Sequence, residues 1–139
     1  MTEAGTKFKL FDLEEAERML PLVKTIVRQI VDDFKLQREK SAEFDQYKQS
    51  LGPAPSRADL VVLKGREEEI DEIDRSVAQG LRELAELGVE FKDFGIGLID
   101  FPSLRGDEIV YLCWKLDEEK IGYWHPLDTG FTGRQPIER

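Results

Sequence analysis

The chain has 139 residues, with 20 lysines and arginines against 29 aspartates and glutamates, and its formal net charge is −9. A chain of this length typically forms one domain with a core of its own, so residues 1–139 are expected to fold as a single domain. The acidic balance disfavours non-specific binding to nucleic acid. The single cysteine excludes an intramolecular disulfide and a cysteine-rich zinc site.

No apolar run reaches the length that a membrane-spanning helix needs. The first residues also lack the apolar centre of a signal peptide. We therefore expect a cytoplasmic protein with neither a membrane nor a nucleic acid as partner, and no motif in the sequence calls for a cofactor.

The N-terminal half predicts a long helical hairpin. Residues 7–11 alternate charged and bulky side chains and predict a short edge strand, after which Asp12 and Glu15 suit a helix start. Apolar residues then keep a heptad spacing and predict a helix over 13–51. A cluster of glycine and proline follows, and a second apolar stripe predicts a helix over 57–87. The short connection makes the two helices antiparallel, as in a coiled coil.

From residue 89 the apolar period changes to two, which predicts an antiparallel meander over 89–125. The expected strands cover 89–92, 98–101, 108–116 and 121–125, and Pro102 is expected to end the second. Residues 126–139 are expected to form an ordered loop, and residues 7–11 would bring the sheet to five strands. The predicted fold class is α+β, with a helical hairpin packed on a small antiparallel meander of four to five strands.

Two features predict a homodimer. A turn at 117–120 would place Leu112 opposite His125 and Trp114 opposite Tyr123, and both faces of the last strands would then be apolar. One face can pack on the hairpin, whereas the other needs the C-terminal residues or a second subunit. The first helix also carries apolar residues beyond a two-helix seam, at Met19, Leu22, Ile26 and Val31.

The candidate site lies in the sequence WHPLDTGFTGR, which contains the only histidine of the chain. His125 could bind a metal or transfer a proton, Asp128 could orient its ring, and Arg134 could bind an anion. Trp114 and Trp124 would flank this ligand or anion site. A metal ion would be held by His125, Asp128 and Glu118, with Glu119 as the alternative to Glu118. The alternative is structural: His125 and Asp128 cap a turn, and Arg134 pairs with an acid such as Asp100.

The C-terminal half resembles an uncharacterised prokaryotic family, domain of unknown function 2203. The segments VYLCWKL, IGYWHPLD and GFTGRQPI carry the likeness, and FDLEEAERMLPLV is similar to the opening helix of that family. The resemblance covers nearly the whole chain but implies no activity and no catalytic residue.

Two functions remain open from the sequence. The first is a non-enzymatic, homodimeric interaction protein that uses its hairpin, with a protein partner possible there. The second is a small metal- or anion-binding protein, or an enzyme, with its site in the C-terminal loop. The sequence favours the first, because no complete catalytic set is present.

Overall fold

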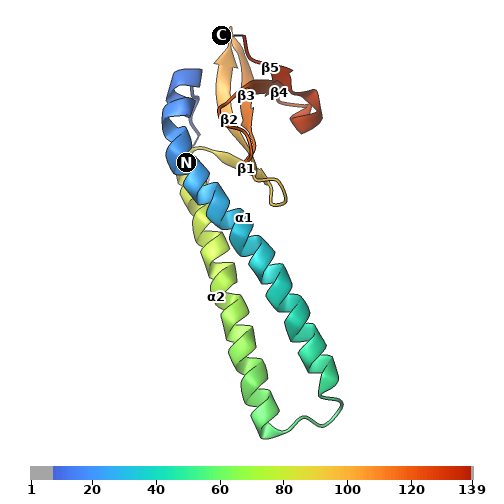
Figure 1. The fold of residues 1–139 in the computed structure, drawn as a ribbon. Helices are drawn as coiled ribbons and strands as arrows, with labels where there is room; N and C mark the ends of the chain where they lie inside the picture. The colour runs from blue at the N-terminus through green and yellow to red at the C-terminus, as the bar shows by residue number, and fades with distance from the viewer. Residues whose placement is uncertain (1–7, 139) are drawn as a thin grey trace.

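A computed structural model describes residues 8–138 and shows an α+β fold, as predicted. Two long antiparallel helices form a hairpin, and a five-stranded antiparallel sheet lies at its base (Figure 1). The strands follow each other in the sheet in chain order, β1-β2-β3-β4-β5. The elements are α1 (Leu13–Ser50), α2 (Arg57–Leu87), β1 (Glu90–Asp93), β2 (Leu98–Arg105), β3 (Glu108–Trp114), β4 (Tyr123–Pro126), the 3-10 helix η1 (Gly130–Gly133) and β5 (Gln135–Pro136).

Both helices begin at capping boxes, which is why the sequence placed them well. Asp12 accepts a hydrogen bond from the Glu15 backbone at 2.8 Å, and the Glu15 carboxylate accepts one from the Asp12 backbone at 3.1 Å. Ser56 and Asp59 repeat the arrangement at the start of α2. Gly88 ends α2 with a φ of 86°, a left-handed conformation that glycine adopts without strain.

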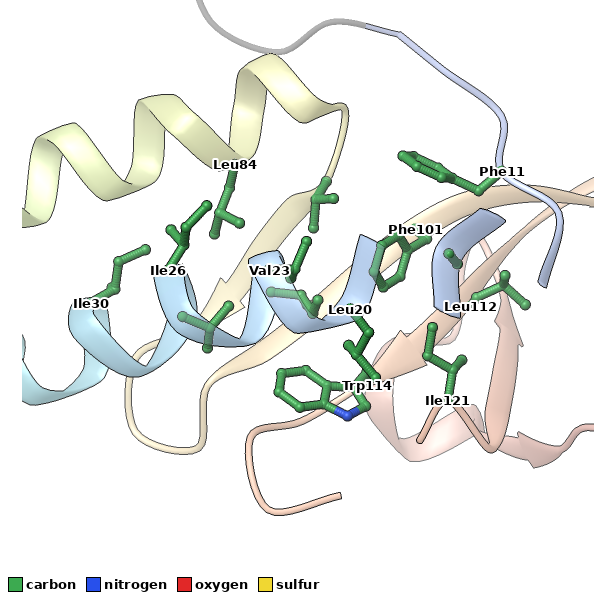
Figure 2. Close-up of a cluster of buried hydrophobic side chains, with 14 residues drawn as sticks. Phe11, Leu20, Val23, Ile26, Ile30, Leu84, Phe101, Leu112, Trp114 and Ile121 are labelled. Atoms are coloured by element: carbon green, nitrogen blue, oxygen red, sulfur yellow. The ribbon is translucent and has the colours of Figure 1, made fainter. Parts of the chain in front are cut away.

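The core lies where α1 packs between α2 and the sheet (Figure 2). Leu84 approaches α1 from α2, while Phe101 and Trp114 approach it from the sheet. Since α1 contacts other elements on two sides, its wide apolar stripe needs no second subunit to cover it. Ile26 is buried in the core of the same chain, and Met19 and Val31 pack against that core; only Leu22 of the four predicted residues is exposed.

The distal half of the hairpin has no core. Within α1 the last buried residue is Ile30, and within α2 the first is Gly80. Polar contacts join the helices beyond the core: Ser76 donates to Asp33 at 2.6 Å, and Lys40 Nζ lies 3.3 Å from a Glu69 carboxylate oxygen. The hairpin therefore projects from the sheet with little apolar support of its own (Figure 1).

Two strand predictions were wrong. Lys7 lies outside the described residues, and residues 8–12 form no strand; the Phe11 backbone instead donates to the Pro102 carbonyl at 2.7 Å. Pro102 does not end β2 but lies inside it. Its carbonyl accepts the hydrogen bond from Phe11 and therefore points away from β3. In an antiparallel strand the N–H and the carbonyl of one residue point to the same side, so the missing N–H of Pro102 removes no hydrogen bond between β2 and β3.

The predicted register of the last hairpin was wrong by one residue. Tyr111 pairs with His125, Leu112 with Trp124 and Cys113 with Tyr123, and β4 begins at Tyr123 and not at residue 121. A shift of one residue exchanges the faces of a strand. His125 therefore lies on the face that also carries Tyr111 and Cys113, away from the helical hairpin.

The C-terminal residues are more regular than predicted. Gln135–Pro136 forms the edge strand β5, which pairs with β4, and η1 precedes it. Ile137 packs against the core as a partly buried side chain. No helix within residues 8–138 is both long enough and apolar enough to cross a membrane.

Two helical glycines make a matched pair for testing this packing. A Cβ at Gly65 would meet nothing within 4 Å, so Gly65→Ala should raise the free energy of unfolding by about 0.5–1 kcal/mol. A Cβ at Gly80 would lie 2.6 Å from Ile30 Cγ1, so Gly80→Ala should instead cost about 1–3 kcal/mol through overpacking. Urea denaturation of both variants measures the difference, and stabilisation by both would contradict the close packing at Gly80.

Candidate functional site

The sheet face opposite the hairpin carries a buried cluster of polar side chains. Asp100 on β2, Cys113 on β3 and His125 on β4 are only 3%, 0% and 2% exposed. Asp100 and Cys113 are direct cross-strand partners, and His125 comes from the next strand. One carboxylate oxygen, the sulfur and one ring nitrogen all lie within 4.8 Å of one another. The prediction that both faces of the sheet are apolar was therefore wrong.

Hydrogen bonds fix the orientation of the His125 ring. Nδ1 lies 2.7 Å from the carbonyl oxygen of Pro126, and since a carbonyl can only accept, Nδ1 carries a proton. Nε2 lies 3.1 Å from each carboxylate oxygen of Asp100. A proton must lie between Nε2 and the carboxylate, either as an imidazolium–carboxylate pair or as a neutral imidazole with a carboxylic acid.

Burial disfavours the charged forms of Asp100, Cys113 and Tyr111. Burial raises the pKa of the Asp100 carboxyl above its ordinary value, and His125 opposes part of that shift. Burial, together with the charge of Asp100, raises the pKa of the Cys113 thiol to about 12. Burial and a hydrogen bond to Glu90 likewise raise the pKa of Tyr111 to about 12. In the protein alone Cys113 is therefore a neutral thiol at physiological pH and a poor nucleophile.

Arg134 lies beside this cluster but pairs with a different acid. Its Nη2 donates to both carboxylate oxygens of Glu118 at 2.7 Å. The guanidinium carbon lies 4.0 Å from the ring centroid of Tyr123 and 4.8 Å from that of Phe131. The Nε of Arg134 is buried without a hydrogen-bond partner. Arg134 thus joins η1 and β4 to the turn after β3.

The structure brings together only part of the predicted site. Trp114 lies on the opposite face, in the core, and its Nε1 donates to the Glu118 carbonyl at 2.9 Å. Trp124 also packs against that core, with the Arg105 guanidinium 4.3 Å from its ring centroid. Asp128 is exposed on the turn after β4, and it is Asp100 that binds His125.

Sequence reasoning did not find Asp100 and Cys113 as site residues. The signal for Asp100 was present, because it is an acid inside the apolar run GLIDFP, and an acid buried in a strand needs a partner. Cys113 was interpreted as a small core residue, which suits its burial but not its polar neighbours. Only the correct register shows that the chain's one histidine and one cysteine share a face.

This arrangement is better suited to binding a metal ion than to transferring a proton to a substrate. A general base must reach the proton that it takes, and the side chains of His125 and Asp100 are only 2% and 4% exposed. A carboxylate, a thiol and an imidazole that converge are the donor types that bind a borderline transition-metal ion. Arg134 does not offer a free guanidinium to an anion, since Glu118 already binds it.

The comparison with known proteins gives a family and nothing closer. The family model described as "Uncharacterized conserved protein (DUF2203)" matches residues 9–137. No curated protein and no solved structure matches the chain.

Proposed function

Because the chain belongs to the family of uncharacterized conserved proteins DUF2203, whose description states no activity, we propose its function from its own surfaces. The protein is a non-enzymatic interaction protein that works as a homodimer, and the two copies meet through the distal part of the helical hairpin. The resemblance noted from the sequence agrees with this family but implies no function, so the proposal is argued from the structure.

One observation carries this proposal. The first turns of α2 contain four consecutive apolar residues, LVVL, at positions 60–63. Four consecutive helical residues point to all sides, and α1 covers only one side. Leu60, Val61 and Val62 remain 52%, 67% and 41% exposed. A helix that is apolar all round is normally buried on every side, so this segment calls for a further partner.

A second copy of the chain fits this segment. Ala58, Val61 and Val62 follow the spacing of one helical face, and all three are exposed. A two-fold axis near Val61 and Val62 would pack this face against itself, as an isologous interface requires. In that antiparallel arrangement Arg57 of one copy would lie level with positions 66–68 of the other, where Arg66 is followed by Glu67 and Glu68.

The oligomeric state tests the proposal. Light scattering at micromolar concentration should give about twice the chain mass of 16.0 kDa. Val61→Lys places a charge at the most exposed of these side chains but keeps a good helix former, so the variant should be monomeric with unchanged helix content. Circular dichroism checks the helix content.

Leu127→Lys is the matched control. Leu127 is also an exposed apolar residue, but it lies on the turn after β4, far from the hairpin tip in sequence. This variant should remain dimeric. A wild-type mass of one chain over the micromolar range would overturn the proposal, as would a dimer that Val61→Lys leaves intact and Leu127→Lys dissociates.

A further inference from the structure

We propose that Asp100, Cys113 and His125 together form a binding site for a divalent transition-metal ion, with zinc as the best-matched ion. The site is separate from the hairpin surface, and the proposal does not depend on dimerisation. The expected metal ligands from sequence were His125, Asp128 and Glu118. The structure keeps His125 and replaces the other two.

The lengths of the three side chains allow their ligand atoms to converge on one face of the sheet. Three adjacent strands each supply one ligand to the same face, and the shortest of the three side chains, Cys113, is on the middle strand. The longer side chains of Asp100 and His125 therefore meet above β3, with the sulfur below them. A larger residue at position 113 would fill the space where the three ligand atoms converge.

The distances suit a tetrahedral ion after a small adjustment. Zinc–ligand bonds of about 2.0–2.3 Å place neighbouring ligand atoms about 3.3–3.6 Å apart. The distance from His125 Nε2 to the Asp100 oxygens is 3.1 Å, close to that value. The ligand atoms lie within 4.8 Å of one another, so the sulfur needs to approach by about 1.2 Å at most. Three protein ligands leave the fourth position to water.

The hydrogen bond of His125 prepares the ring for coordination. A metal-binding histidine usually donates its other ring N–H to a carbonyl or carboxylate, which fixes the tautomer. Here Nδ1 donates to the Pro126 carbonyl at 2.7 Å and leaves Nε2 to face the cluster. The same bond means that the protein alone must hold a proton between Nε2 and Asp100.

A divalent ion would replace protons without leaving buried charge. The proton between His125 and Asp100 and the proton of the Cys113 thiol are released, so two protons leave for each ion bound. Carboxylate, thiolate and neutral imidazole then balance the two positive charges of the ion. No oxidation or reduction is involved. A neutral buried site satisfies the requirement that charges in an interior be compensated.

Cobalt(II) provides the probe, because a tetrahedral cobalt–thiolate site absorbs in a ligand-to-metal charge-transfer band as well as in visible d–d bands. The whole chain, without a histidine tag, is unfolded in chelator and refolded metal-free, since buried ligands exchange slowly. Titration with Co²⁺ should give one ion per chain, the charge-transfer band, release of two protons and a rise in Tm. Zn²⁺ should displace the cobalt. The chain has one cysteine, so a thiolate band in the wild-type protein identifies Cys113 as the ligand without any variant.

Cys113→Ser should remove the charge-transfer band, whereas Asp128→Asn should bind cobalt like the wild-type protein, because Asp128 is exposed and outside the cluster. If Cys113→Ser does not fold, the wild-type titration still decides. Refolded wild-type protein that binds no Co²⁺ or Zn²⁺ in equilibrium dialysis would overturn the proposal. So would bound cobalt without a thiolate band, or binding that Asp128→Asn abolishes.

Discussion

Replacing His125 with alanine is expected to lower the free energy of unfolding of the metal-free protein by about 3–5 kcal/mol. The substitution removes a buried ring from the sheet and leaves the Asp100 carboxyl buried without its partner at 3.1 Å. The Pro126 carbonyl loses its hydrogen bond from His125 as well. The first loss is the larger, because it leaves a buried carboxyl without its His125 partner, whereas the Pro126 carbonyl still accepts from the Thr129 backbone and hydroxyl at 3.4 Å. Urea denaturation followed by circular dichroism, with chelator present throughout, measures the effect.

Asp100→Asn is the matched variant for this pair. Asparagine has the shape of aspartate, and its amide can donate to Nε2 of a neutral His125, so the cost should be clearly smaller than for His125→Ala. A double-mutant cycle with both substitutions gives the coupling between the two residues. A loss below about 1 kcal/mol for His125→Ala, equal to that of an exposed-site change such as Asp128→Ala, would show that the buried pair does not support the fold.

The helical half of the fold was predictable because its signals are local. The capping residues Asp12 and Ser56, the breaker cluster after the first helix and Gly88 each act within one turn of the chain. The predicted second helix therefore matches Arg57–Leu87. What the sequence could not show is which side of α1 each apolar residue faces, since the core against which Met19 and Val31 pack includes sheet residues from far along the chain.

The sheet and the site depended on register, which is not a local property. Both possible registers of the last hairpin placed apolar residues on the core face, because Trp124 and Tyr123 are similar in bulk and polarity. The connection between β3 and β4 covers residues 115–122 and not only 117–120, and the register differs by one residue, which moved His125 to the other face. The partners Asp100 and Cys113 follow only from that pairing. The pairing of Arg134 with an acid such as Asp100 was one of two alternatives from the sequence; in the structure the acid is Glu118.

Replacing Arg134 with alanine is expected to cost about 2–3 kcal/mol, because it breaks a largely buried, charge-assisted contact with Glu118. The guanidinium also covers the rings of Tyr123 and Phe131, so the variant should release the segment around η1. Hydrogen exchange should then accelerate at Gly130–Gly133 while the helices remain protected. Thermal unfolding measures the loss of stability, and hydrogen exchange on the same samples measures the release of the segment around η1.

Arg134→Lys separates the two contributions. Lysine keeps the charge that pairs with Glu118 but loses the planar group that lies on the rings of Tyr123 and Phe131, so it should recover part of the stability lost with alanine. Glu118→Gln should weaken the same contact from the other side. Sites that serve a ligand are commonly unfavourable for stability, so their removal leaves Tm unchanged or raises it. A higher Tm for Arg134→Ala would therefore contradict the structural role assigned here and identify the loop around Arg134 as a ligand site.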